Sequence, residues 1–191
     1  REVVNIQKNY KNIKLNIKEK KYLIDGFGKE RINFFINKPI KERLELKKIN
    51  LEDIDLMFGW ANDDLVRKNS FKKKKIRYSD HIIWFKKKLL SKKTLIFKLL
   101  LNNIPIGQVR YDKKNNYYEI DYSIDEIFRN YGFGKIILKK SIKKIFKKGT
   151  IIRADVKHRN KESMYIFKSL NFKQIKSSSI KKTFELLSNN I

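Results

Sequence analysis

Hydrophobic and polar positions follow a regular period along the chain from residue 43 onward. Alternation with a period of two predicts strands, and apolar residues three and four positions apart predict amphipathic helices. The expected elements are strand 43–49, helices 51–65 and 80–90, strands 94–101, 104–111 and 117–125, helix 135–147, strand 150–156, helix 160–170, and strands 172–175 and 181–186. This order predicts a mixed α/β sheet with helices on both faces.

Local signals sharpen several of these boundaries. Asn50 and Ser79 each precede an amphipathic pattern and are expected to cap the first two helices. The pair Asn102-Asn103 separates two strand-like runs, which predicts a β-hairpin.

The first forty residues differ from the rest. They contain a short alternating run, a turn signal at Asp25-Gly26-Phe27-Gly28 and a proline at Pro39. This segment is too short to form a core alone. We therefore expect residues 1–40 to be the C-terminal remnant of a preceding domain or a linker, and residues 41–191 to be one folded domain.

Composition changes this picture in a few respects. The formal net charge is +27, but the lysines are scattered, so nucleic acid is not expected as the main partner. There is no cysteine, which excludes thiolate catalysis and cysteine-ligated zinc, and two histidines make an evident metal site unexpected. Without a long apolar stretch or a signal-peptide pattern, we expect no membrane insertion and a cytoplasmic location.

The run Arg129-Asn130-Tyr131-Gly132-Phe133-Gly134-Lys135 lies between an expected strand and an expected helix. Glycines allow a ligand to approach the backbone closely. The first N–H groups of a helix have no intrahelical acceptor and carry the positive end of the helix dipole. Arg129 and Lys135 add full charges, so the run predicts a phosphate or pyrophosphate site.

A family resemblance rests on this run together with two later segments. Arg129, Gly132 and Gly134 match an (Gln/Arg)-x-x-Gly-x-(Gly/Ala) motif, and Asn160-Lys161-Glu162-Ser163 and Leu170-Asn171-Phe172 follow in the expected order. Over about residues 43–187 the chain resembles GNAT-family N-acetyltransferases. The resemblance implies the GNAT-like acyl-CoA N-acyltransferase fold, with helices on both faces of a central, mainly antiparallel sheet.

The resemblance also implies where acetyl-CoA binds and how it reacts. The cofactor is expected between strands 117–125 and 150–156, with its pyrophosphate on the backbone N–H groups of residues 130–135. The strand around Tyr122 and Ile124 would pair with the pantetheine amides, and Asn160 would bind the cofactor arm or a water near the thioester. The acceptor amine attacks the thioester directly, without an acyl-enzyme.

Several residues are candidates for proton transfer. Glu119 is the expected general base, with Asp121 on the same strand face as the alternative; both can instead be solvated carboxylates. Many GNAT members have a general-acid tyrosine where this chain has Phe167. Tyr165, Ser163 or water are the remaining candidates, and Tyr165 can equally be structural.

The acceptor side resembles the acetyltransferases of the pseudaminic-acid pathway, which acetylate the 4-amino group of a UDP-linked amino-deoxy sugar. Residues 22–32 also resemble the C-terminal end of the UDP-sugar hydrolase of that pathway, which suggests a fusion or association. Arginines are expected at the diphosphate, tryptophans on a ring face and histidine at a hydroxyl. The expected acceptor-binding residues are Trp60, Asn62, Arg67, His81, Trp84 and Arg110.

Structural roles compete with these assignments. Trp84 and His81 lie on an amphipathic helix and can belong to the core, and Arg67 can pair with Asp63 four residues earlier. Two other functions also remain: acetylation of a ribosomal protein or peptide N-terminus, and binding of CoA or RNA without transfer.

Overall fold

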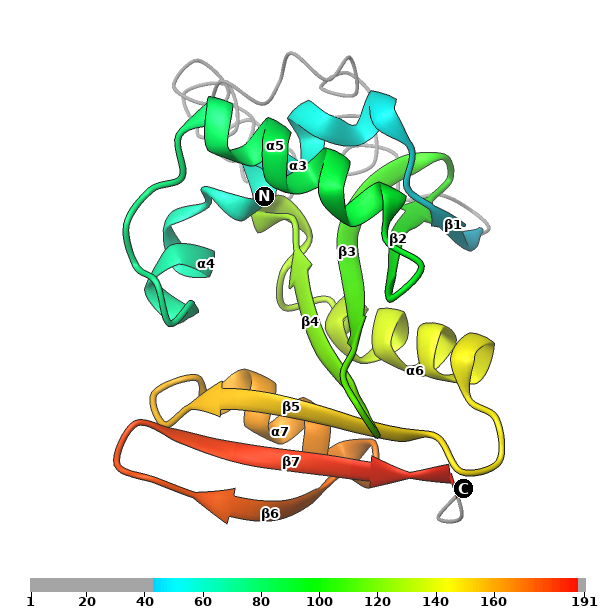
Figure 1. Ribbon diagram of the computed structural model, residues 1–191, viewed down its shortest axis with the longest axis vertical. Helices are drawn as coiled ribbons and strands as arrows, with labels where there is room; N and C mark the ends of the chain where they lie inside the picture. Colours follow the sequence, from blue (N-terminus) through cyan, green and yellow to red (C-terminus); the bar gives the residue numbers. More distant parts are fainter. Residues whose placement is uncertain (1–42, 189–191) are drawn as a thin grey trace, which may run out of the picture.

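The computed structural model describes residues 43–188, and within them a seven-stranded sheet carries helices on both faces (Figure 1). The strands are β1 (Leu44–Lys48), β2 (Thr94–Leu101), β3 (Ile104–Lys113), β4 (Tyr118–Ile124), β5 (Ile151–Lys157), β6 (Lys173–Ser177) and β7 (Lys181–Leu187). The helices are η2 (Leu51–Asp53), α3 (Ile54–Ala61), α4 (Asp64–Asn69), α5 (Tyr78–Leu90), η3 (Glu126–Phe128), α6 (Phe133–Ile145) and α7 (Lys161–Ser169). The expected fold class is confirmed.

The strand order is β1-β2-β3-β4-β5-β7-β6, and every neighbouring pair is antiparallel except β4 with β5. Alternation along β2 divides the core between the two faces of the sheet. Phe97 and Leu99 belong to the large cluster that includes α6 and α7, while Ile96 belongs to the cluster with α3 and α5. Burying each such side chain contributes about 1.5–3 kcal/mol.

The hairpin prediction is confirmed, because Asn102 and Asn103 both have positive φ, 49° and 70°, as a two-residue turn between twisted strands requires. Two helix predictions need correction. The expected helix 51–65 is η2, α3 and α4, and it breaks where Asp63 caps α4 by accepting a hydrogen bond from the Val66 N–H. The next helix begins at Tyr78, so Ser79 lies inside its first turn rather than at its cap.

The prediction that residues 1–40 come from a preceding domain concerns residues outside the described range. Within residues 43–188, no helix is both long and apolar enough to cross a membrane.

Candidate active site

The parallel strands β4 and β5 separate after a short stretch of pairing (Figure 1). Their only register pairs are Tyr118 with Ile152 and Glu119 with Arg153, within the described residues. Beyond Glu119 the strands diverge and enclose a cleft of about 490 Å³. The cleft is lined by residues 120–124 of β4, 154–157 of β5, and parts of α4, the glycine run, α6 and α7. The expected splay between the two strands is therefore present.

The glycine run opens α6 at one end of this cleft. Gly132 is the N-cap of α6 with φ 82°, and Asn130 has φ 68°, so two left-handed residues turn the backbone toward the helix axis. The first N–H groups of α6 face this end without intrahelical acceptors. The Lys135 N–H already donates to the Gly132 carbonyl, at 3.1 Å. Fewer backbone N–H groups are therefore open to a pyrophosphate than the expected set from residues 130–135.

The other side chains of the run are divided between core and surface. Phe133 is buried against Phe128, whereas Tyr131 and Lys135 are exposed. Gly134 has a packing role, because a Cβ there would lie 3.1 Å from Ile166 Cδ1 and 3.2 Å from Tyr122 Cε2. Glycine at this position therefore lets α6 approach α7 and β4.

Arg129 lines the cleft, but its guanidinium is engaged by protein groups. Nε donates to the Ile124 carbonyl at 3.1 Å, and Nη2 donates to Asp63 Oδ1 at 2.7 Å. The expected free positive charge at the pyrophosphate site is therefore neutralised by Asp63. The alternative role of Arg67, an ion pair with Asp63, is not seen among the described residues, because Asp63 pairs with Arg129 on the turn before the glycine run.

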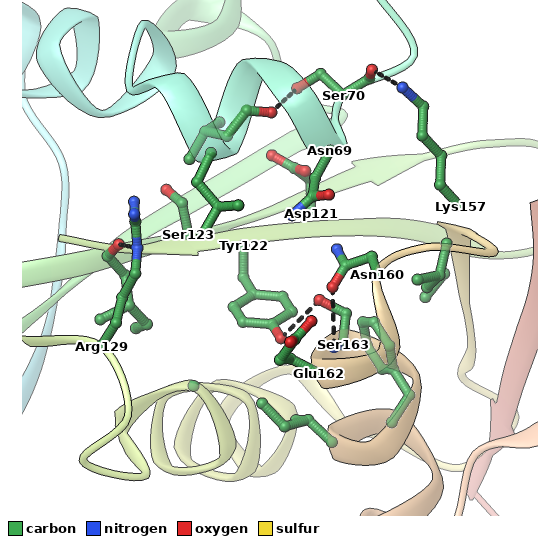
Figure 2. Close-up of a pocket in the computed structure, with 18 of the residues that line it drawn as sticks. Asn69, Ser70, Asp121, Tyr122, Ser123, Arg129, Lys157, Asn160, Glu162 and Ser163 are labelled. Atoms are coloured by element: carbon green, nitrogen blue, oxygen red, sulfur yellow. Dashed lines mark hydrogen bonds between the residues drawn. The ribbon is translucent and has the colours of Figure 1, made fainter. Parts of the chain in front are cut away.

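The two candidate bases differ in position. Glu119 lies where β4 still pairs with β5, and its carboxylate forms an ion pair with Lys114 at 3.0 Å, outside the cleft lining. Asp121 lies two residues further, where the strands have separated, and it lines the cleft. Arg110 Nη2 approaches its carboxylate at 3.6 Å, and Figure 2 shows it on the α4 side of β4. The geometry favours Asp121 over Glu119 as a base.

The opposite side of β4 faces α7 and carries Tyr122. Its hydroxyl oxygen is 3.0 Å from Ser163 Oγ, and the Asn160 side chain caps α7 by accepting from the Ser163 N–H at 3.1 Å (Figure 2). Burial raises the pKa of Tyr122 to about 12. Phe167 lines the cleft beside this group, while Tyr165 is 73% exposed and does not line it. The expected catalytic role of Tyr165 does not agree with this orientation.

The expected acceptor-binding residues lie elsewhere. Trp60 is buried, and its indole N–H donates to Asp125 at 2.9 Å. His81 is also buried and stacks on Phe85; its Nε2 contacts the Ile54 carbonyl at 3.0 Å. Burial lowers the pKa of His81. Both are core residues, so neither ring is open to a ligand.

Asn62 and Arg67 hold the loop that follows α4. The Asn62 amide donates to the Ile76 carbonyl and accepts from its N–H. Arg67 donates to the Lys72 carbonyl and to Ser70 Oγ, and burial lowers its pKa although Asp121 opposes the shift. These contacts shape the cleft wall indirectly.

Trp84 and Arg110 contact each other instead of a ligand site. The Arg110 guanidinium lies 5.3 Å from the Trp84 ring centre, and its Nε donates to Asp112 at 2.9 Å. None of the six expected acceptor residues, all within the described range, lines the cleft. Residue type alone therefore did not identify the residues that line the cleft.

Sequence reasoning did not single out other residues that line the cleft, at the end away from the glycine run. Phe71 lines the cleft with half of its side chain exposed, and the ammonium groups of Lys157 and Lys181 lie 5.5 and 5.7 Å from its ring. Lys157 donates to the Ser70 carbonyl, which joins β5 to the end of α4 (Figure 2). An aromatic residue inside a lysine-rich loop was the available sequence signal.

The electrostatics at Lys157 are unfavourable to its charge. Desolvation lowers its pKa, and the neighbouring charges of Arg159 and Lys73 lower it further. In Figure 2, Lys157 and Arg129 lie at opposite ends of the cleft. One end therefore offers helix N–H groups, and the other places Lys157 and the ion pair of Lys181 with Asp155 beside an exposed ring.

Comparisons with known proteins agree with this arrangement. The family model for the acetyltransferase (GNAT) domain matches residues 43–173. The chain belongs to the GNAT acetyltransferase family. It is a GNAT-type N-acetyltransferase, and members of this family use acetyl-CoA. The match begins at residue 43 and gives no support to the hydrolase resemblance of residues 22–32. A comparison with curated proteins found no match.

Solved structures share the fold at low sequence identity. Spermidine N-acetyltransferase from Vibrio cholerae, in complex with CoA and spermine, has a TM-score of 0.69 at 14% identity, covering 76% of this chain and 96% of that chain. The N-acetyltransferase PseH from Campylobacter jejuni has a TM-score of 0.58 at 19% identity, covering 75% and 97%. A domain from Methanocaldococcus jannaschii has a TM-score of 0.65 at 21% identity, covering 76% and 99%.

Proposed function

We propose that the protein transfers the acetyl group of acetyl-CoA to the 4-amino group of a UDP-linked amino-deoxy sugar. In this proposal the pyrophosphate of CoA binds at the N-terminus of α6, near Gly132 and Gly134. The pantetheine arm lies along the open edge of β4 beside Tyr122 and Ile124, and Asn160 faces the thioester.

The observation that carries the acceptor class is the exposed Phe71 ring beside Lys157 and Lys181. An aromatic face suits a nucleobase or a sugar ring. The Lys157 ammonium, which donates to the Ser70 carbonyl, brings positive charge that suits a diphosphate, whereas Lys181 is paired with Asp155. Close to Lys157 and Arg159, a polyamine acceptor is disfavoured because like charges repel. The resemblance of the sequence to the pseudaminic-acid pathway acetyltransferases supports the same class.

Chemically, Asp121 is the proposed base. It accepts a proton from the acceptor ammonium or from the nitrogen as the C–N bond forms, directly or through water. The chain has no cysteine to form an acyl-thioester intermediate, which is consistent with direct attack.

An acceptor panel tests the proposal. The protein is incubated with acetyl-CoA and, separately, with UDP-amino sugars, spermidine and basic peptides, and acetylated products are measured by mass spectrometry. We expect a mass gain of one acetyl group on UDP-amino sugars. Turnover of peptides alone would support the N-terminal acetylation alternative, and turnover of none would support a binding module.

A further inference from the structure

Two hydroxyl groups meet inside the cleft, where Tyr122 of β4 contacts Ser163 of α7 (Figure 2). Their oxygen atoms are 3.0 Å apart, and both residues line the cleft. Each hydroxyl has one proton to donate. The bond between them uses one proton, so one O–H is left to donate to a third group.

A second hydroxyl pair in the same protein shows the structural alternative. Tyr111 and Ser141 are 2.7 Å apart and fully buried, and Ser141 Oγ also contacts the Leu138 carbonyl at 3.1 Å. Both protons of that pair have acceptors. Among residues 43–188, Tyr122 and Ser163 have no second hydrogen-bond partner for their hydroxyls, and they face a cleft instead of the core.

The Tyr122 hydroxyl is held in place from several sides. Its ring meets Phe167 edge-to-face, with 5.8 Å between ring centres, and packs close to Gly134. Ser163 lies in the first turn of α7, which Asn160 caps. The position of the pair is therefore set before any ligand binds.

Phe167 itself cannot donate a proton, and its ring is buried against Phe172 and Phe184. We propose that the Tyr122–Ser163 hydroxyl pair donates a hydrogen bond to the sulfur atom that leaves acetyl-CoA. This inference rests on the proposed function, because it requires that the thioester lies beside Asn160 in the cleft.

The step balances without a further reactant. The acceptor nitrogen forms a C–N bond to the acetyl carbon, the C–S bond breaks, and its electron pair moves to sulfur. The spare O–H stabilises the charge that develops there. The proton lost by nitrogen goes to Asp121 or water, and the released thiolate takes a proton from water.

The acidity of Tyr122 fits a hydrogen-bond donor. Burial raises its pKa to about 12, so the phenol stays protonated at neutral pH. An ordinary thiol has a pKa of about 8.5, so complete proton transfer from Tyr122 to the thiolate is unfavourable. Tyr122 therefore stabilises the leaving group without losing its proton.

Removing the pair tests the proposal. In single-turnover kinetics with the best acceptor of the panel, Tyr122→Phe/Ser163→Ala is expected to slow acetyl transfer about 100-fold. Its Kd for CoA, measured by calorimetry, should stay within about threefold of the wild-type value, because a contact to developing charge acts in the transition state. The matched control, Tyr111→Phe/Ser141→Ala, removes the buried pair and should leave the rate within about twofold.

A rescue separates a donor from a packing role. Adding Phe167→Tyr to the double variant adds a hydroxyl to a ring that lines the cleft 5.8 Å from the Tyr122 ring centre, and should recover at least about tenfold of the rate. An unchanged rate in the double variant, an equal loss in the control, or no rescue overturns the donor role. If no acceptor is turned over, the proposed function fails; the variants are then compared in hydrolysis of acetyl-CoA, which expels the same thiolate and should show the same loss.

Discussion

Arg129 donates a 2.7 Å hydrogen bond to Asp63, which lies 66 residues earlier in the chain. The same carboxylate oxygen accepts from the Val66 N–H and so caps α4. Arg129 also binds the Ile124 carbonyl at the end of β4. This one contact holds α4 against the turn that precedes the glycine run, and it therefore sets the position of two walls of the cleft.

Replacing Asp63 by alanine should destabilise the protein by about 3 kcal/mol. The substitution removes a helix cap and leaves the largely buried Arg129 guanidinium without its anion. Urea unfolding measures the loss, and calorimetry should show weaker CoA binding. Asp64→Ala is the control: its ion pair with Lys75 is exposed, so the expected change is under about 1 kcal/mol. Equal losses would contradict the prediction.

Glycine replacements should separate steric from conformational requirements. A Cβ at Gly107 would lie 2.6 Å from the Ser123 carbonyl oxygen, so Gly107→Ala should destabilise by about 3 kcal/mol. A Cβ at Gly132 meets nothing within 4 Å, but the φ of 82° makes alanine cost about 1–2 kcal/mol. Thermal unfolding should rank Gly107→Ala as the more damaging change. The opposite order would show that the close approach of β3 to β4 relaxes easily.

The candidate bases can be separated kinetically. Asp121→Asn should lower kcat about 100-fold or more, because Asp121 lines the cleft, with little change in CoA affinity. Glu119→Gln removes a carboxylate that pairs with Lys114 outside the cleft and should change kcat less than about threefold. Steady-state kinetics with the best acceptor measures both variants. A larger effect at Glu119 would restore the assignment made from sequence alone.

Acidification should weaken the fold through His81. Burial lowers the pKa of His81 in the folded state, so the unfolded chain binds more protons. The stability linked to neutral His81 is therefore fully present above its unfolded pKa of about 6.5. It is lost as pH falls from there through the folded pKa of His81, by at most about 1.4 kcal/mol per pH unit.

The variant His81→Gln checks this proton linkage. Glutamine can keep a donor to the Ile54 carbonyl but does not titrate. Urea unfolding between pH 7.5 and 5.5 should show a flatter dependence than in the wild-type protein. An unchanged slope would assign the acid sensitivity to other groups.

The positive charge of Lys157 should affect binding of the acceptor and not binding of acetyl-CoA. Lys157→Ala is expected to raise KM about tenfold for an anionic acceptor while leaving KM for acetyl-CoA nearly unchanged, because its charge lies away from the glycine run. The control Lys140→Ala removes an exposed lysine of α6 and should change neither value. Equal effects on both substrates would place the CoA phosphates at Lys157 instead.

Much of the fold could be predicted because the signals are local. The strand-turn-helix around Gly132 and the turn at Asn102-Asn103 follow from residue types within a few positions of each other. Asn171 illustrates the same point: it follows α7 and adopts φ 65°, a left-handed conformation that asparagine tolerates. Helix 51–65 was mispredicted because its break depends on Asp63 and its contact with Arg129.

The sequence predicted the glycine run of the candidate site but not the side chains that line the rest of the cleft. Residues proposed to bind through the backbone, such as Gly132, were found from their spacing. Trp60 and His81 were chosen by side-chain chemistry, which does not reveal whether a ring faces a cleft or the core.

The sequence alone determined the family, the glycine run and the alternation that separates Asp121 from Tyr122 on the two sides of β4, since each depends on short-range spacing. The tertiary structure decided which polar groups meet. Tyr122 reaches Ser163 across 41 residues, and Arg129 reaches Asp63 across 66. Such pairs form because the register of the sheet and the packing of helices on its faces bring residues together that are far apart in the chain. The spacing of residues along the sequence does not encode these contacts.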